Sequence, residues 1–321
     1  MSASDPVQSA RDPVKSVESV WIFHRGALGD SILLWPLMRA LRRKKRAVTL
    51  VSDASKGALA HRELGVRAVS AELKRFSDLW VTGAAKEPGR LPPLSDVSRV
   101  LSFVVVQGKD RTWAENAHAM FPGAALEVYD TQLDRRLALE LAEREAVVHD
   151  PPISVPAADS AVVMHVGAGS RIKRWPLKAW VEVIDRLRKL HPELPIQVVA
   201  GEAEEEQFSR EQVAAFDQLG GRFIGALPDL AEVLRAARLV IVADSGPAHL
   251  AAQLGVTTLT LFGPTVPGRW SPIGPAVRVV APDVPSAMDW LRPDQVVHEI
   301  EQTLLHSAAG APPGFTLREP L

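Results

Sequence analysis

The chain has 321 residues, no cysteine and a formal net charge of -1. A chain of this length exceeds one ordinary hydrophobic core, and the lack of cysteine excludes disulfides, thiolate metal sites and a cysteine nucleophile. The balanced charge argues against nucleic acid as the main partner, because phosphate backbones require clustered Lys and Arg.

The N-terminal segment is polar and lacks the apolar core of a signal peptide. We expect residues 1–17 to form a disordered leader. No apolar run approaches the roughly 18 residues of a membrane span. We therefore expect a cytoplasmic protein.

The first predicted domain, residues 18–150, opens with a strand, a turn and a helix. Val20 to His24 is a short apolar strand that runs into RGALGD, residues 25–30. From Ser31 to Leu41 the apolar residues keep one helical face, and Ala47 to Val51 returns as a second strand. This order predicts a βαβ unit.

The rest of this domain is less regular and leads to a proline-rich linker. We expect strands at 66–69, 100–106 and 125–129, helices at 56–64, 71–79 and 133–148, and a loop over 81–98. Residues 151–160 carry three prolines in a polar setting, which indicates the linker between two domains.

A second alternating series forms the predicted C-terminal domain, residues 161–306, before a flexible tail at 307–321. We expect strands at 161–166, 196–200, 222–224, 239–243 and 257–262, and helices at 176–190, 204–216, 230–237, 248–254 and 293–305. Because strands and helices alternate on both sides of the linker, the sequence predicts an α/β fold of two facing, doubly wound parallel sheets.

The stretch LVIVADSGPAHLAAQLG, residues 239–255, combines a buried strand with a helix start. It delivers Asp244, Ser245 and Gly246 to the carboxyl edge of the sheet, where ligands of α/β folds bind. The helix N-terminus offers free N–H groups and partial positive charge, so an anion is expected there. His249 in the first turn has two equal interpretations, a donor to a phosphate or sugar and a buried histidine with satisfied hydrogen bonds.

The turn RGALGD places Asp30 at the start of a helix. The helix dipole is expected to lower the pKa of this carboxyl group. A simple helix cap is the alternative interpretation of Asp30. The glycine spacing differs from the dinucleotide fingerprint GxGxxG, so a dehydrogenase is weakly supported.

Two further turns carry charge. In GAGSRIKRWP, residues 167–176, Lys173 and Arg174 precede a helix and suit a diphosphate, although two surface cations there would be unremarkable. In GEAEEEQF, residues 201–208, Glu202 ends a strand, where a carboxylate can accept hydrogen bonds from ribose hydroxyls. Glu204 to Glu206 are expected to form the acidic first turn of a solvated helix.

Taken together, RGALGD, GAGSRIKRWP, GEAEEE and ADSGPAHLAAQLG followed by TLFGPTVPGRW resemble glycosyltransferase family 9, the ADP-heptose:lipopolysaccharide heptosyltransferases and their relatives. The resemblance covers about residues 20 to 300 and is weakest over 56–150. It implies a GT-B fold whose interdomain cleft is the active site, with the acceptor on the N-terminal domain and the nucleotide sugar on the C-terminal domain. It also implies inverting transfer in lipopolysaccharide biosynthesis, without a metal and without a cofactor beyond the nucleotide-sugar co-substrate, which is expected to be ADP-linked.

The resemblance also implies roles for individual residues. Asp30 would be the general base, and Lys173 would offset the charge on the leaving diphosphate, with the backbone N–H groups of Ser245 and Gly246. Glu202 would hold the ribose, and Asp244 the donor sugar hydroxyls or the helix turn. The full set of implied positions is Asp30 and Lys173 for catalysis; Gly169, Ser170, Lys173, Glu202, Asp244, Ser245, Gly246 and His249 for the donor; and Gly26, Ala27, Leu28 and Gly29 for the acceptor-side loop.

The chain departs from the family where threonine hydroxyls often reach the phosphates, because Ala168 and Gly169 stand there with Ser170 adjacent. Another nucleotide sugar and an acceptor other than lipopolysaccharide therefore stay open. Two other functions also stay open, a nucleotide-sugar epimerase or hydrolase of the same fold and a nonenzymatic nucleotide-sugar-binding protein. The basic segment 39–46 is best interpreted as a solvated helix end, with contact to the inner membrane as the alternative.

Overall fold

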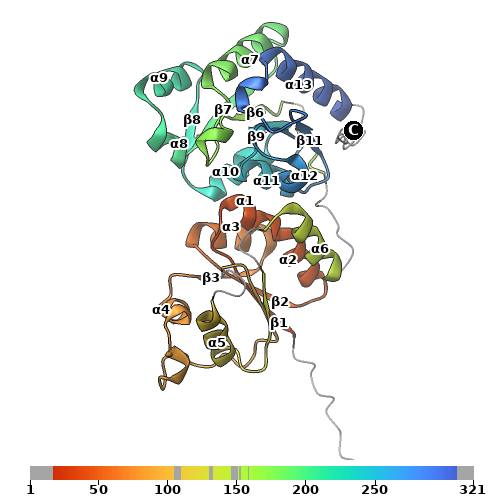
Figure 1. Ribbon diagram of the computed structural model, residues 1–321. Helices are drawn as coiled ribbons and strands as arrows, with labels where there is room; N and C mark the ends of the chain where they lie inside the picture. Colours follow the sequence, from red (N-terminus) through yellow and green to blue (C-terminus); the bar gives the residue numbers. More distant parts are fainter. Residues whose placement is uncertain are drawn as a thin grey trace, which may run out of the picture.

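The computed structural model describes residues 17–104, 110–129, 133–145, 151, 153–157 and 159–308. Its two halves are stacked end to end, and each is built around one parallel sheet (Figure 1). The predicted α/β class with two doubly wound parallel sheets is confirmed.

The first sheet has five parallel strands in the order β3-β2-β1-β4-β5. Their bounds are β1 Ser19–Phe23, β2 Ala47–Ser52, β3 Arg67–Ser70, β4 Arg99–Ser102 and β5 Ala125–Val128. In the central strand β1, Val20 and Ile22 pack into one core while Trp21 and Phe23 pack into another. Because both faces are covered, β1 is apolar at successive positions rather than at alternate ones.

Six helices cover this sheet within the residues that the structure describes. Their bounds are α1 Leu28–Leu33, α2 Trp35–Arg43, α3 Ala54–Leu64, α4 Lys74–Ser77, α5 Arg111–Met120 and α6 Arg135–Glu145. Short 3₁₀ turns occur at η1 Asp78–Trp80 and η2 Ala84–Lys86. Helices α2, α3 and α6 contribute to the core on one face, and α4 and α5 contribute to the core on the other.

The second sheet has six parallel strands in the order β11-β10-β9-β6-β7-β8. Their bounds are β6 Val162–His165, β7 Ile196–Gly201, β8 Arg222–Ile224, β9 Leu239–Ala243, β10 Thr258–Leu261 and β11 Val277–Val280. The winding direction reverses between β6 and β9, as it does between β1 and β4 in the first sheet. Such switch points are where open α/β sheets bind ligands.

The described part of the second half contains seven helices. Their bounds are α7 Leu177–Leu190, α8 Glu202–Gln207, α9 Arg210–Gln218, α10 Leu227–Arg235, α11 Gly246–Gln253, α12 Pro267–Trp270 and α13 Pro293–Ala308. Two 3₁₀ turns lie at η3 Arg171–Lys173 and η4 Met288–Trp290. Helices α7, α9 and α13 pack on one face, and α10 and α11 on the face that is turned toward the first half (Figure 1).

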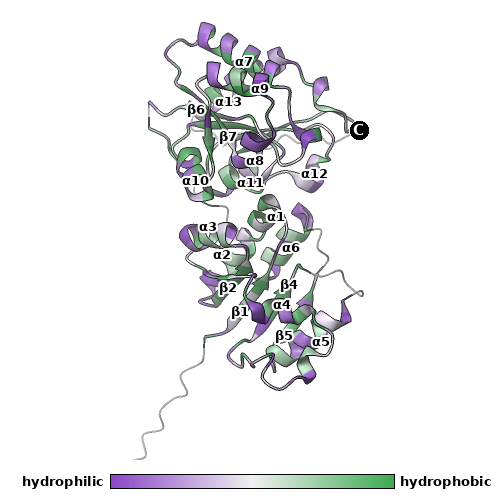
Figure 2. Cartoon of the chain, turned by 90° about the vertical axis from the view of Figure 1, so that its left-hand side faces the viewer, coloured by the Kyte–Doolittle hydropathy of each residue, from purple (hydrophilic) through white to green (hydrophobic). Residues whose placement is uncertain are grey.

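The two halves meet where α1 packs against α11, an arrangement visible in Figures 1 and 2. The approach is close because glycine stands on both sides. A methyl group on Gly246 would lie 2.8 Å from the Leu28 side chain, and one on Gly29 would lie 3.1 Å from the His249 ring. Apolar residues of both halves form one continuous core cluster across this contact.

Polar contacts surround this apolar junction. Arg39 donates to the backbone carbonyl of Gln253 at 2.8 Å, and Arg235 forms an ion pair with Glu63. In addition, the backbone N–H of Ser154 donates to the carbonyl of Gly255 at 2.8 Å. The two arginine contacts hold the first half against the second around the α1–α11 contact, and the Ser154 bond ties the predicted linker to the second half.

Several predicted elements differ from the structure. The predicted helix 204–216 is two helices, because Ser209 forms a capping box with Gln212 and starts a new helix. The predicted helix 71–79 shrinks to α4, which is followed by η1. Helix α5 and strand β11 were not predicted. Helix α5 is largely polar and buries Trp113 and Ala117 four residues apart, so its apolar pattern is weak. Strand β11 is only four residues long.

The predicted leader and tail lie mostly outside the described residues. Helix α13 continues to Ala308, beyond the predicted helix end at Leu305. The ends of the predicted strand 100–106 and helix 133–148 also fall partly outside the described ranges. The domain boundaries, with a linker at 151–160, stay a prediction.

Three histidines near the strand ends are buried. His24 follows β1, His165 ends β6 and His249 lies in α11, and their exposed fractions are 0%, 2% and 5%. Burial lowers the pKa of each imidazole to about 4. These side chains are therefore neutral at neutral pH.

The α1–α11 contact predicts that Gly246→Ala destabilises the protein. The added methyl group would overlap the Leu28 side chain, and overpacking of this kind costs about 1–3 kcal/mol. Gly225→Ala is the matched control, because a methyl group there meets nothing within 4 Å. Denaturant unfolding of the two variants checks this, and equal stabilities would contradict the close contact.

The buried histidines predict a loss of stability in mild acid. Their native pKa of about 4 lies below the unfolded value of 6.5, so the unfolded state binds more protons between these values. The stabilisation is complete above pH 6.5 and declines as the pH falls toward 4, by about 1–2 kcal/mol for each histidine between pH 7 and 5. His165→Asn, whose amide oxygen can still accept from Gly167, should reduce this slope in unfolding measurements at several pH values. An unchanged slope would be inconsistent with a buried neutral His165.

Candidate functional site

Four segments converge at the carboxyl edges of the two sheets, on both sides of the α1–α11 contact. They are the turn into α1, the start of α3, the turn after β6 that holds residues 167–176, and the segment from Asp244 into α11. The first two belong to the first half and the last two belong to the second half. Most of the predicted site residues lie on these segments.

Asp30 is the third residue of α1 and is partly buried. Burial raises the pKa of Asp30, and a hydrogen bond from the Ala27 backbone and the charges of Lys173 and Lys56 oppose this effect. The prediction that the helix start lowers this pKa is therefore wrong, because loss of solvent outweighs the dipole. A raised pKa makes Asp30 a stronger base than an exposed aspartate.

Lys173 of the second half is paired with Asp244 at the end of β9. Its Nζ atom lies 2.7 Å from Asp244 Oδ2, and the Thr265 hydroxyl donates to the same oxygen at 2.6 Å. The Asp244 side chain is 5% exposed and that of Lys173 is 27% exposed. A buried carboxylate thus holds a partly exposed cation in place beside the interface.

Lys56 supplies a second cation from the first half. Its Nζ atom donates to the backbone carbonyl of Gly26 and lies 2.6 Å from Asp53 Oδ2. Lys56 therefore anchors the turn that carries Asp30. Lys56 was not among the site residues predicted from the sequence, although its position in the first turn of the helix after β2 puts it at the same sheet edge.

Arg174 and Lys173 point to different partners. Arg174 Nε donates to the Ala168 carbonyl at 2.9 Å, and the guanidinium also lies 3.0 Å from Glu204 and 2.8 Å from Gln207. Of the two predicted cations, Lys173 pairs with Asp244, and its contact with a diphosphate stays a prediction. Arg174 instead braces the turn.

Glu204 is buried, so the prediction that it lies on a solvated first turn is wrong. Its carboxylate accepts the backbone N–H groups of Ala168 and Gly201, both at 3.1 Å. A side chain at Gly167 would collide with this carboxylate, which explains the glycine. Burial raises the pKa of Glu204. Glu202 is an exposed residue at the start of α8, and its ribose role stays a prediction.

The other residues predicted to bind the donor lie around the Lys173–Asp244 ion pair. Ser245 is the N-cap of α11, and its hydroxyl donates to the Ala243 carbonyl at 3.0 Å rather than to the first helical turn. His249 packs against the glycine turn of the first half, since a methyl group on Gly29 would lie 3.4 Å from its Nε2 atom. Gly169 and Ser170 are exposed on the turn before η3. Their ligand contacts, like that of His249, stay predictions.

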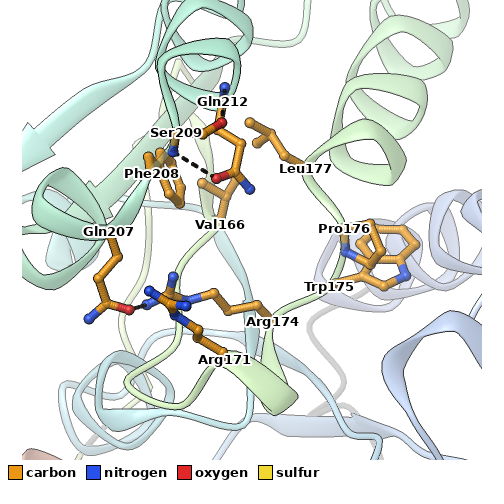
Figure 3. A pocket seen from close by; sticks show the side chains of 10 residues that line it. All are labelled: Val166, Arg171, Arg174, Trp175, Pro176, Leu177, Gln207, Phe208, Ser209 and Gln212. Carbon is orange, nitrogen blue, oxygen red and sulfur yellow. Dashed lines mark hydrogen bonds between the residues drawn. The ribbon is translucent and has the colours of Figure 1, made fainter.

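A cavity of about 410 Å³ lies beside the same turn, on the side that Arg174 faces (Figure 3). Figure 3 shows the Arg171 and Arg174 side chains next to Gln207, opposite Phe208. The lining residues are Val166, Arg171, Arg174, Trp175, Pro176, Leu177, Gln207, Phe208, Ser209 and Gln212. Its lining does not include Asp30, Lys173 or Asp244. The cavity therefore lies next to these charged residues but is a separate space.

In the part of the chain that the structure describes, no helix combines the length and the apolar character needed to cross a membrane. The basic segment after α2 is largely engaged within the protein. Arg46 pairs with Glu145 at 2.7 Å, and Lys44 lies 3.3 Å from the same carboxylate. These contacts favour the interpretation of a helix end bound to its own fold.

Comparison with known proteins identifies the family. The sequence profile of glycosyltransferase family 9 (heptosyltransferase) matches residues 95–296, more than half of the chain. Lipopolysaccharide heptosyltransferase 1 of Pseudomonas aeruginosa is 32% identical over 132 residues, which cover 41% of this chain and 36% of the relative. The Salmonella typhimurium protein of the same name is 33% identical over 96 residues, 30% of each chain. The chain thus matches about a third of the length of these curated relatives.

Solved structures share the architecture. A family 9 glycosyltransferase from Veillonella parvula has a TM-score of 0.66 at 17% identity, over 90% of this chain and 98% of that one. An E. coli heptosyltransferase with ADP has a TM-score of 0.63 at 16% identity, over 89% and 99% of the two chains. At such identities the likeness concerns the fold, which is the predicted GT-B arrangement. The profile match, together with this fold, shows that the chain belongs to glycosyltransferase family 9.

Proposed function

We propose that this protein is an inverting, metal-independent glycosyltransferase. It moves a sugar from a nucleotide diphosphate donor to a hydroxyl of a glycan or glycolipid, with heptose from ADP-heptose as the family expectation. One observation carries the proposal. Helix α1, which carries Asp30, packs against α11 at the edge where Lys173 pairs with Asp244, and the charges of these two residues act on the pKa of Asp30, so a base and a cation face one site from two domains.

Asp30 acts as the general base in the proposed reaction. It takes the proton of the acceptor hydroxyl while that oxygen forms a bond to the anomeric carbon. The bond from this carbon to the diphosphate breaks on the opposite side, and the bonding electrons leave with the diphosphate, which inverts the configuration. The raised pKa of Asp30 supports this role, because a base works best when its pKa approaches the working pH.

Lys173 stabilises the leaving diphosphate. The cation lies beside the N-terminus of α11, whose first turn has no side-chain cap. The backbone N–H groups of Ser245 and Gly246 are therefore suited to share the negative charge. Asp244 holds Lys173 ready before the donor arrives and accepts hydrogen bonds from the donor sugar afterwards.

The identity of the donor is supported by the structural neighbours. Two solved E. coli heptosyltransferase structures hold ADP and ADP-2-deoxy-2-fluoro heptose, with TM-scores of 0.63 and 0.60. An ADP-linked heptose is therefore the first donor to test. For the acceptor we propose a lipopolysaccharide precursor, met in the cytoplasm at the inner face of the membrane.

The proposal predicts that Asp30→Asn abolishes transfer while the donor still binds. Loss of a general base lowers kcat by about 10²- to 10⁴-fold. Asp185→Asn, which changes an exposed aspartate on α7, is the matched control and should keep full activity. The assay follows release of the nucleoside diphosphate with and without an acceptor. Wild-type release that needs no acceptor would instead indicate a hydrolase, and conversion of the donor into an isomeric nucleotide sugar without release would indicate an epimerase.

A second prediction concerns donor binding. ADP at about 100 times its dissociation constant should stabilise the wild type by about 2.7 kcal/mol in thermal unfolding. Lys173→Ala should lose most of this stabilisation, because it removes the cation that meets the diphosphate, whereas Lys189→Ala on the exposed side of α7 should retain it. A panel of nucleoside diphosphates then identifies the base. Equal responses of the two lysine variants would refute the role of Lys173.

A further inference from the structure

The cavity beside the η3 turn is a part of the molecule that the proposed reaction does not use (Figure 3). The turn from β6 to the start of α7 forms one side of it, and the end of α8 with the start of α9 forms the other. Its volume of about 410 Å³ lies within the range of about 300–1,000 Å³ that is typical of small-molecule sites. Among the side chains that line it, two are cationic and none is acidic, which favours an anionic ligand.

Arg171 and Arg174 supply the positive charge. Arg174 Nε donates to the Ala168 carbonyl at 2.9 Å. Its Nη2 atom lies 3.0 Å from Glu204 and 2.8 Å from Gln207, whereas its Nη1 atom has no hydrogen-bond partner among the described residues. The exposed Arg171 guanidinium makes neither a hydrogen bond nor an ion pair within the same residues. Because Glu204 balances Arg174 alone, the charge of Arg171 is left uncompensated at the cavity.

The amide oxygens around the cavity are already used by the fold. Gln207 Oε1 accepts from Arg174 at 2.8 Å, and Gln212 Oε1 accepts the backbone N–H of Ser209 at 3.0 Å. The Ser209 hydroxyl oxygen accepts the Gln212 N–H at 3.3 Å in return. Figure 3 shows the Gln212 amide across the cavity from the two guanidinium groups. This amide therefore offers its NH₂ group, so the polar groups left for a ligand are donors.

An apolar wall lies between these donors. It includes Val166, Leu177 and Phe208, and Phe208 is held by edge contacts with other aromatic rings of α9 and β8. The Trp175 N–H donates to the Leu291 carbonyl at 3.1 Å, so this ring contributes only apolar surface to the cavity. A fitting ligand thus combines an oxyanion with an apolar or aromatic body.

We propose that this cavity binds a small organic phosphate. The phosphate group meets Arg171 and Arg174 Nη1, the body lies against Phe208 and Leu177, and an acceptor oxygen at its far end meets the Gln212 amide. A phosphate is favoured over a carboxylate because it has a higher negative charge and one more acceptor oxygen for the two guanidinium groups. The site is separate from the proposed donor site and does not depend on the proposed transfer reaction.

Calorimetric titration with para-nitrophenyl phosphate tests the site, because this probe has a phosphate, an aromatic body and acceptor oxygens at the far end. Arg171→Gln removes a charged donor and should raise the Kd about tenfold or more. Gln212→Glu keeps the oxygen that caps α9 but replaces the free NH₂ group with an acceptor, so it should raise the Kd several-fold. Arg210→Gln is the matched control, because this exposed residue of α9 does not line the cavity, and its loss of the same charge should leave the Kd unchanged.

The other outcomes would overturn the proposal. They are the absence of saturable binding to the wild type, an equal Kd in Arg171→Gln and Arg210→Gln, and binding of para-nitrobenzoate as tight as that of the phosphate. Lys173→Ala should retain the probe, and loss of binding in this variant but not in Arg171→Gln would place the probe at the donor site instead. If the wild type transfers no sugar but binds the probe as expected, the transferase proposal fails and the cavity site stands.

Discussion

The close contact between the first turns of α1 and α11 is the constraint on which the rest of the site depends. Gly29 and Gly246 allow the two helix starts to touch, with Leu28 and His249 filling the remaining space. This contact fixes the distance between the two sheets at their carboxyl edges. A carboxylate from one half and a cation from the other can then act on the same ligand, although the chain between them is more than a hundred residues long.

Exclusion of solvent at the α1–α11 contact determines the direction of the pKa shifts there. The helix start favours the ionised form of Asp30, yet burial has the larger effect and raises its pKa. The same burial lowers the pKa of His24 and His249 to about 4. Removal of water from this one place therefore makes a carboxyl group more basic and keeps two imidazoles neutral. The chemical character of the site is thus set by the packing around it.

The sequence predicted the parallel sheets and the positions of Asp30, Lys173 and Asp244, because each follows an apolar strand and such strand ends share one edge. It could not separate Lys173 from Arg174, which are adjacent in the chain but have partners on different segments. It also misjudged Glu204, because an acidic run in a helical first turn has the same pattern whether it is solvated or buried. Lys56 and Thr265 were missed since their importance arises from neighbours that are distant in sequence.

The ion pair between Lys173 and Asp244 has a consequence for how the protein selects among anions. Because an internal carboxylate already balances the lysine, the ion pair itself carries little net charge toward solvent. Polyanions at a distance are therefore not drawn toward it, and the near-neutral chain as a whole behaves likewise. Under the proposed function, an anion would gain from the lysine only by direct contact, so discrimination would depend on its shape rather than on its total charge.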